Sequence, residues 1–307
     1  MILTVTLNPV LDKSVTVDNI VPDQKLRCSN PLYYAGGGGI NVSKGIKKLD
    51  GHSIALFPSG GANGKKIEWI LSDSGIPTKV VNVDYETRES FIVNTIIPNQ
   101  QYRFNTPGEE ISKQILDTIF EYIVSLKPKI LVVSGSLPIG APLDTYANIA
   151  KIAHSIGSKM ILDTSGDALK HAAESGVFLL KPNINELCNL VGESSLELDL
   201  VDEAAQSIIE KGYCEVVVVS MGASGALLVT KDTYQHIKAP PVKKVSTVGA
   251  GDSMVAGLAY ALSNGKSLIE MAQLGVACGT AATMNPGASL FKQQDVQSLL
   301  NYILRKN

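Results

Sequence analysis

The residues best suited to chemistry lie in one short stretch, Ser246-Thr247-Val248-Gly249-Ala250-Gly251-Asp252. A small-residue helical pattern follows it, so two glycines and an acid stand where a helix begins. The unpaired N–H groups and the dipole of a helix start attract anions such as phosphate. Glycines let the main chain approach such a ligand closely. A carboxylate beside that anion is useful as a proton acceptor, which makes Asp252 the candidate general base. The alternative is a plain first-turn helix acid.

Two further glycine-rich segments, 36–39 and 60–64, also open helical patterns. Three such segments suggest two anionic groups to hold, although glycine runs can also serve the backbone conformation alone. The chain has neither the GxxxxGK[ST] motif nor a GxGxxG motif after its first strand pattern. This disfavours P-loop nucleotidases and NAD-dependent oxidoreductases.

Four cations stand on or beside short strand patterns, namely Lys25, Arg27, Arg88 and Arg103. Opposite a glycine-rich loop they fit a sugar phosphate, because arginine forks match phosphate oxygens. Taken singly, each could instead be a charge that protects a sheet edge. Asn183 and Glu186 have the spacing of a capping box. The carboxylate could also act on a nucleotide phosphate through Mg²⁺ and its waters.

The elements that would position these residues alternate between strand and helix patterns. Strands are expected at 2–7, 53–58, 78–83, 130–134, 159–163, 177–180 and 216–219, and helices at 109–126, 143–156, 166–176, 251–263, 267–284 and 292–304. Such alternation predicts a doubly wound α/β fold with a mainly parallel sheet. Ligands bind at the carboxyl ends of such strands, where Ser134, Asp163, Lys181 and Ser220 stand. Strand patterns at 14–20 and 31–35, with a hairpin at 89–97 and 101–105, predict a second, small sheet.

Composition narrows the class of protein. The chain has 307 residues, of which 45% are hydrophobic and 18% charged, with a net charge of −2. This favours a globular protein with a large core and argues against nucleic acid or anionic membranes as partners. No signal peptide or 18-residue apolar segment is visible, so we expect a cytoplasmic protein. The four cysteines are widely spaced, which favours buried reduced thiols over zinc or disulfides.

With these motifs assembled, the chain resembles the ribokinase-like sugar kinases, and most closely their minor 6-phosphofructokinase branch. The resemblance runs nearly end to end, through 6–9 with Asp12, 25–28, 36–42, 101–104, 134–138, 181–186 and 240–252. It implies one α/β kinase domain over 1–307 with a discontinuous β lid at about 13–35 and 88–106. It also implies phosphoryl transfer from Mg-ATP, a monovalent cation, for which K⁺ is the candidate, and a homodimer through the lid.

The resemblance assigns roles by position. Asp252 looks like the catalytic base and Gly249, Ala250 and Gly251 like the anion hole. The substrate set would be Asp12, Gly37, Gly38, Gly39 and Asn41 for the sugar, with Lys25, Arg27, Arg88, Arg103 and Ser136 for its phosphate. The nucleotide set would be Lys181, Asn183, Ser220, Gly222, Gly225 and Thr247. Glu186 would act on Mg²⁺ through water, and the monovalent cation would implicate Ser246, Val248, Ala282, Asn285 and Gly287.

One position bears on the substrate. The related fructose-1-phosphate and tagatose-6-phosphate kinases typically have lysine where this chain has Gly38. The absent charge favours fructose 6-phosphate, phosphorylated at its 1-hydroxyl to fructose 1,6-bisphosphate. Tagatose-6-phosphate kinase and 1-phosphofructokinase remain the enzyme alternatives. A sugar-phosphate sensor without activity is a further one, disfavoured by the presence of Asp252.

Overall fold

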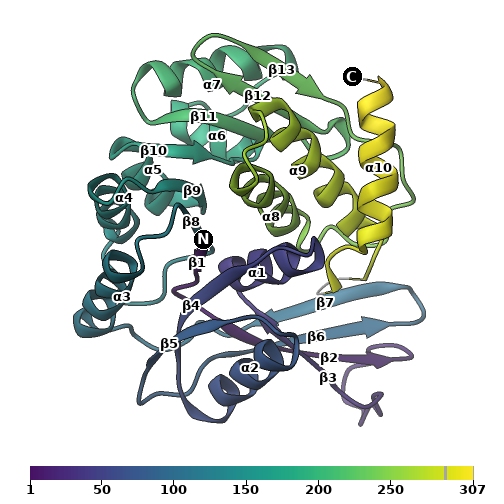
Figure 1. Ribbon diagram of the computed structural model, residues 1–307. Coiled ribbons are helices and arrows are strands. Elements are labelled where there is room, and N and C mark those ends of the chain that lie inside the picture. Colours follow the sequence, from purple (N-terminus) through teal and green to yellow (C-terminus); the bar gives the residue numbers. More distant parts are fainter. Residues whose placement is uncertain (287–288, 307) are drawn as a thin grey trace.

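A nine-stranded sheet forms the centre of the computed structural model, which describes residues 1–286 and 289–306 (Figure 1). The strand order is β13-β12-β11-β10-β9-β8-β1-β4-β5. The strands from β11 to β5 are parallel, and β12 and β13 join antiparallel at one edge. Their bounds are β1 Ile2–Val5, β4 Ser53–Ser59, β5 Thr78–Asn82, β8 Ile130–Ser134, β9 Lys159–Asp163, β10 Val177–Leu180, β11 Cys214–Ser220, β12 Ala226–Thr230 and β13 Tyr234–Ile237. The strand order reverses between β1 and β8, and such a switch point is where open α/β sheets bind ligands.

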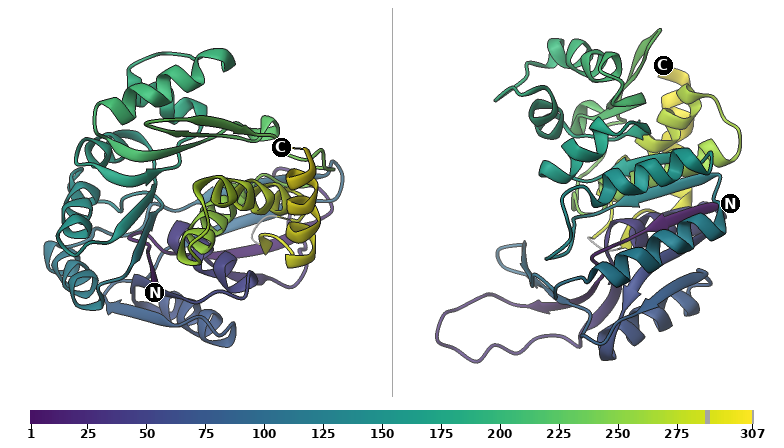
Figure 2. Two further views of the ribbon diagram at one scale, coloured as in Figure 1. Left: turned by 45° about the horizontal axis from the view of Figure 1, so that its top comes forward. Right: turned by 90° about the vertical axis from the view of Figure 1, so that its left-hand side faces the viewer.

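Helices cover both faces of this sheet (Figures 1 and 2). One face packs against α3 Lys113–Leu126, α4 Thr145–Ser155, α5 Gly166–Glu174, α6 Ile184–Val191 and α7 Val201–Glu210. The other packs against α1 Gly38–Lys48, α8 Ala250–Ser263, α9 Leu268–Thr283 and α10 Gln293–Lys306. A third cluster joins α2 Gly61–Asp73 to β4 and to the second sheet. Strands buried on both faces explain the nearly all-apolar run of β11.

The second sheet has the strand order β3-β2-β6-β7. Its strands are β2 Val10–Val17, β3 Leu32–Gly36, β6 Glu89–Thr95 and β7 Gln100–Asn105. Register and the alternation of side chains place Asp12 and Arg103 on one face, together with the buried Ile92. Phe91 and Phe104 pair on the opposite face, where both are exposed. One face of this sheet therefore carries polar groups toward the main body. The other packs against α2 through Leu11 and Ala35 and exposes Phe91 and Phe104 beyond that contact.

The predicted fold class and small sheet are confirmed, and the strands at 130–134, 159–163 and 177–180 have the predicted bounds. Three predictions were wrong in detail. The strand expected at 14–20 is β2 at 10–17, so Asp12, which the predicted strands at 2–7 and 14–20 left in a connection, lies inside a strand. The helix expected from 109 begins at Lys113, because Ser112 caps it and the backbone N–H of Ile111 donates to Ile139. Helix α7 was missed.

The connection between β2 and β3 projects away from the main body as a long irregular loop (Figure 2). Cys28 is exposed in it, whereas the other three cysteines are buried, so the expectation of buried thiols holds for Cys188, Cys214 and Cys278 alone. Among the described residues, no helix combines the length and the hydropathy needed to cross a membrane.

Candidate active site

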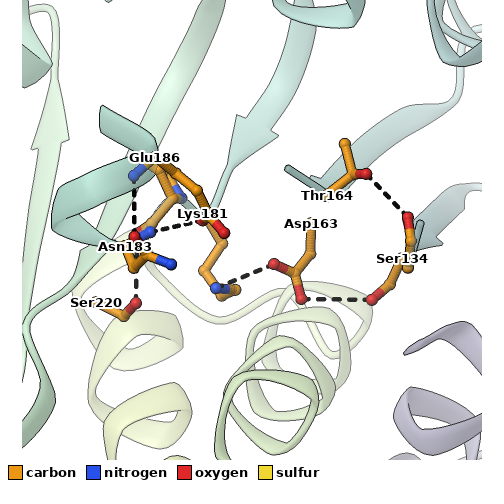
Figure 3. Close-up of polar contacts among 9 residues, drawn as sticks. Ser134, Asp163, Thr164, Lys181, Asn183, Glu186 and Ser220 are labelled. Carbon is orange, nitrogen blue, oxygen red and sulfur yellow. Dashed lines mark hydrogen bonds and ion pairs between the residues drawn. The ribbon is translucent and has the colours of Figure 1, made fainter. Parts of the chain in front are cut away.

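A buried ion pair occupies the carboxyl ends of the parallel strands (Figure 3). The Lys181 ammonium lies 3.0 Å from Asp163 Oδ1, and its side chain is 5% exposed. Ser134 at the end of β8 donates its hydroxyl to Asp163 Oδ2 at 3.3 Å. Burial opposes the charge of Lys181, but Asp163, Glu186 and Asp252 outweigh it and raise the pKa of the lysine. Lys181 therefore stays cationic at the switch-point edge.

Helix α8 begins at this edge with Gly249 as its N-cap residue. Gly249 has a φ of 72°, a left-handed conformation that favours glycine. A Cβ atom added to Gly251 would lie 3.8 Å from the Lys181 ammonium, so the helix start and the cation share one spot. Asp252 stands in the first turn of α8, and burial followed by the charge of Asp163 raises its pKa to about 6. A carboxyl with that pKa can accept a proton near neutral pH.

Helix α1 supplies the hydrogen-bond partner of this acid. Asn41 Nδ2 donates to Asp252 Oδ2 at 3.0 Å. The Lys44 ammonium, one turn further on, donates to Asn41 Oδ1 at 3.1 Å and to the Ala35 carbonyl at 2.9 Å. Burial lowers the pKa of Lys44 to about 8, against the opposing charges of Asp12 and Asp252. Sequence reasoning predicted Asn41 but missed Lys44, although its i+3 spacing from Asn41 on one helix face was a usable signal.

Asp12 faces the same region from the small sheet. Burial raises its pKa, while the charges of Arg103, Lys44 and Arg88 act in the opposite direction. Arg88 donates to the carbonyls of Asn8 and Thr106, both at 3.2 Å, and its buried Nε has no hydrogen-bond partner within the described part of the chain. The structure thus brings Asp12, Arg88 and Arg103 together.

Lys25 and Arg27 are not brought to this group. Both are exposed in the projecting loop between β2 and β3 (Figure 2). Ser136 is likewise exposed, in the loop after β8.

The glycine-rich segment before α1 lies against the ends of β1 and β8. Gly37 has a φ of 113°, and the backbone N–H of Ile40 donates to Thr6 Oγ1 at 2.8 Å. A Cβ atom on Gly38 would lie 2.6 Å from the Ser134 carbonyl carbon, and one on Gly39 would lie 2.5 Å from the Val5 carbonyl oxygen. Close approach to the sheet therefore requires glycine at both positions.

The expected nucleotide residues gather beside β10 and β11. Asn183 and Ser220 form a bridge, and both are labelled in Figure 3. The Ser220 backbone N–H donates to the Pro182 carbonyl at 2.8 Å, and its hydroxyl donates to the same carbonyl at 3.4 Å. Gly222 and Gly225 follow in the next turn, and Gly225 has a φ of 96°. Thr247 is exposed before α8.

Asn183 and Glu186 form a capping box, with both backbone bonds at 2.9 Å. This leaves Glu186 Oε1 outside the cap. Burial raises the pKa of Glu186, against the backbone bond at Asn183 and the charge of Lys181, while the charge of Asp163 raises it further. Glu186 and Asp163 are therefore two carboxylates near the same lysine. Carboxylate oxygens are ligands that suit Mg²⁺, directly or through water, and these residues fit such an ion.

The residues expected around a monovalent cation lie where the segment before α8 meets the end of α9. The backbone N–H groups of Val245 and Ser246 donate to the Thr283 carbonyl at 2.7 and 3.2 Å. Val248 N donates to Ser246 Oγ, and Asn285 Nδ2 donates to the Ala281 carbonyl. Ala282 is buried beside them, and Gly287 lies outside the described residues.

Comparison with known proteins identifies the family of the chain. Residues 5–295 match the pfkB family of carbohydrate kinases. An ATP-dependent 6-phosphofructokinase isozyme 2 of Mycobacterium tuberculosis is 42% identical, over 96% of this chain and 88% of the relative. A 1-phosphofructokinase of Bacillus subtilis is 35% identical, over 98% of this chain and 97% of the relative.

Solved structures of phosphofructokinase-2 from Escherichia coli cover 99% of both chains. The complex with potassium has a TM-score of 0.96 at 40% identity, and the complex with fructose-6-phosphate has a TM-score of 0.94 at 38% identity. Both the sequence match and the fold extend over nearly the whole chain. The chain belongs to the pfkB family of carbohydrate kinases.

Proposed function

We propose that this chain is an ATP-dependent 6-phosphofructokinase, which transfers the γ-phosphoryl group of ATP to the 1-hydroxyl of fructose 6-phosphate. The observation that carries the proposal is Asp252, a carboxyl with a pKa of about 6 in the first turn of α8, beside the buried cation Lys181. The relatives of greater identity are named 6-phosphofructokinases, and the 1-phosphofructokinase is more distant.

The reaction assigns each part of the site a task. Asp252 accepts the proton of the sugar's 1-hydroxyl while the hydroxyl oxygen forms a bond to the γ-phosphorus. At the same time the bond between that phosphorus and the β,γ-bridging oxygen breaks, and ADP leaves. The backbone N–H groups of 249–251 and the Lys181 ammonium stabilise the charge on the moving phosphoryl oxygens. Catalysis is then mainly positioning and charge stabilisation.

The sugar and its phosphate bind between the small sheet and α1. Asp12, Asn41 and the loop 37–39 are proposed to hold the sugar hydroxyl groups, and Arg88 and Arg103, whose charges act on Asp12, are proposed to hold the 6-phosphate. Ser136 is a further candidate for this phosphate, in the loop after β8.

ATP binds along the ends of β10 and β11. The residues proposed to contact it are Lys181, Asn183, Ser220, Gly222, Gly225 and Thr247. Glu186 would hold Mg²⁺ through water, and the ion would neutralise charge on the phosphates. K⁺ is the proposed monovalent cation beside Ser246, Val248, Ala282 and Asn285, supported by the potassium complex of the E. coli relative.

The residue at position 38 bears on the choice among substrates through its missing charge. The related kinases typically carry lysine here, but in this chain a side chain at position 38 would collide with the backbone of 134–135. The choice of substrate is tested by measuring turnover side by side with fructose 6-phosphate, tagatose 6-phosphate and fructose 1-phosphate. Fructose 6-phosphate should give the highest kcat/KM. An equal or higher value for either competitor would refute the assignment, and no ADP release with any of the three would favour the sensor.

We further propose that residues 1–307 act as one kinase domain and that the small sheet is its lid, through which two copies pair. The outer face of this sheet exposes Phe91, Tyr102 and Phe104, an apolar surface suited to a second copy. In such a pair, the projecting loop with Lys25 and Arg27 would contact the second copy instead of the site of its own chain. Phe104→Glu should convert a dimer into monomers in analytical ultracentrifugation. A wild-type protein that sediments as a monomer at micromolar concentration would contradict the pairing.

A further inference from the structure

Lys44 lies at the centre of a hydrogen-bond chain that the roles above leave unexplained. The chain runs from the Ala35 carbonyl through the Lys44 ammonium and the Asn41 amide to Asp252 Oδ2. It links the small sheet, α1 and α8. Lys44 has no carboxylate within 4.0 Å among residues 1–286 and 289–306. Its ammonium therefore contacts oxygen acceptors that carry no net charge.

The chemistry of these groups fixes the direction of the chain. A lysine ammonium only donates hydrogen bonds, whereas an asparagine amide has one accepting and one donating end. Lys44 therefore requires Asn41 to present Oδ1 to it. The other end of the amide, the NH₂ group, must then face Asp252, and an ionised carboxylate only accepts. Without Lys44 the amide can turn its oxygen toward Asp252 whenever that carboxyl is protonated, because a protonated carboxyl can donate to it, and this arrangement stabilises the protonated acid over the ionised base.

We propose that Lys44 is a positioning residue for the reaction, which fixes the orientation of the Asn41 amide so that its NH₂ group holds one oxygen of Asp252 and leaves the other for the substrate hydroxyl. The inference rests on the proposed function in taking Asp252 as the base. It does not require Lys44 to touch the substrate.

The charged groups around this chain come from α1 itself and from the elements packed against it. Asp163 of β9 and Lys181 after β10 face Asp252, with Lys44 of α1. Asp12 of β2, Asp252 of α8 and Lys48 of α1 face Lys44, and Arg88 and Arg103 face Asp12. Since Lys44 is one cation among several, neutralising it alone shifts the ionisation of Asp252 by charge as well as through the amide. A test must separate these two effects.

Lys44→Met removes both the charge and the donor, while Lys44→Arg keeps both. For Lys44→Met we expect kcat to fall at least tenfold, a change in both KM values below about threefold, and a rise of about one pH unit in the acidic limb of kcat. Lys44→Arg should recover most of kcat. Lys47→Met, an equal charge change on the exposed part of the same helix, is the matched control and should leave the limb in place.

A double-mutant cycle separates the amide from the charge. In an Asn41→Ala background the amide is absent, so Lys44→Met should then move the limb by less than half as much as in the wild type. An equal shift in both backgrounds would overturn the proposal in favour of a charge effect. An unchanged limb and kcat in Lys44→Met would overturn it outright. If Lys44→Met does not fold, Lys44→Gln is measured with the same criteria.

A second measurement does not depend on activity. The pH dependence of unfolding by urea, taken as the difference between each protein and its Asp252→Asn partner, reports the pKa of Asp252 in the absence of substrate. That pKa should be higher in Lys44→Met than in the wild type. An unchanged value would refute the positioning role even if the chain phosphorylated no sugar, whereas failure of the substrate assay with a shifted pKa would refute the proposed function alone.

Discussion

Replacing Asp252 with asparagine should remove activity and at the same time stabilise the fold. The substitution keeps the shape of the side chain and an oxygen that can accept the bond from Asn41 Nδ2, which is 3.0 Å long in the wild type. It removes the proton acceptor. We expect kcat to fall by roughly 10² to 10⁴, the usual contribution of a general base, with a modest change in nucleotide affinity.

The stability effect follows from the pKa of Asp252, which burial and Asp163 raise from 3.8 to about 6. The folded state therefore holds this proton more tightly than the unfolded state. As pH rises from 4 to 6, the wild type loses stability relative to the variant, and above pH 6 the loss is complete. A difference of about two pH units corresponds to about 3 kcal/mol in a fully buried site. Because the Asp252 side chain is only partly buried, solvent screening lowers the expected effect to roughly 1–3 kcal/mol.

Urea unfolding of both proteins at several pH values between 4 and 8 tests this reasoning. The free energy of unfolding of the variant should rise relative to that of the wild type between pH 4 and 6. Above pH 6 the difference should stay constant. Asp117→Asn, on the exposed surface of α3, is the control and should show no such gain. A free-energy difference that does not change with pH would refute the raised pKa, and a loss of kcat below about tenfold would refute the role of base.

Three further predictions concern the groups around Asp252. At saturating substrate, kcat should rise with pH through an apparent pKa of about 6, because burial raises the pKa of Asp252 and the base must be ionised. Initial rates measured at a series of pH values test this. If the residual activity of Asp252→Asn shows the same rise, the pKa belongs to another group. Lys181→Met leaves Asp163, which is 16% exposed, without its partner and should cost about 3–5 kcal/mol in urea unfolding, whereas Asp163→Asn combined with Lys181→Met should recover part of that loss. Gly38→Ala should destabilise the protein by about 1–3 kcal/mol, because the new Cβ would overlap the backbone of 134–135, and Gly38→Lys should lose fructose 6-phosphate turnover without gaining the competitors; normal stability of Gly38→Ala would show that the loop can move.

The features that could be predicted from sequence are those with local causes. Glycine and acid at a helix start identify α8 and its N-cap, since the pattern depends on residues a few positions apart. The strands at 130–134, 159–163 and 177–180 were predicted with the observed bounds, because buried parallel strands are short apolar runs between clear turns. The rule that parallel strands end at one edge then brought Asp163 and Lys181 to the same place.

The features that could not be predicted depend on pairing between distant segments. Asp12 lies inside β2 because this strand pairs with both β3 and β6, and the sequence around residue 12 does not indicate either partner. Lys25 and Arg27 stand in a connection without periodicity, so nothing local shows that it projects away from the site. Lys44 was missed since its partners, Ala35 and Asn41, are meaningful only once Asn41 is known to contact Asp252.

The contact between α1 and α8 is what converts two separate glycine-rich helix starts into one site. Gly45 faces α8 so closely that a Cβ atom there would lie 2.6 Å from Ala256 Cβ. Small residues on both helices allow the two backbones to approach one another, and the bond between Asn41 and Asp252 lies about one turn away on the same faces. The helix that follows the loop 37–39 and the helix that carries Asp252 are therefore fixed to each other by packing. Because packed cores resist deformation, this contact fixes the position of Asp252, the proposed base, before either proposed substrate binds.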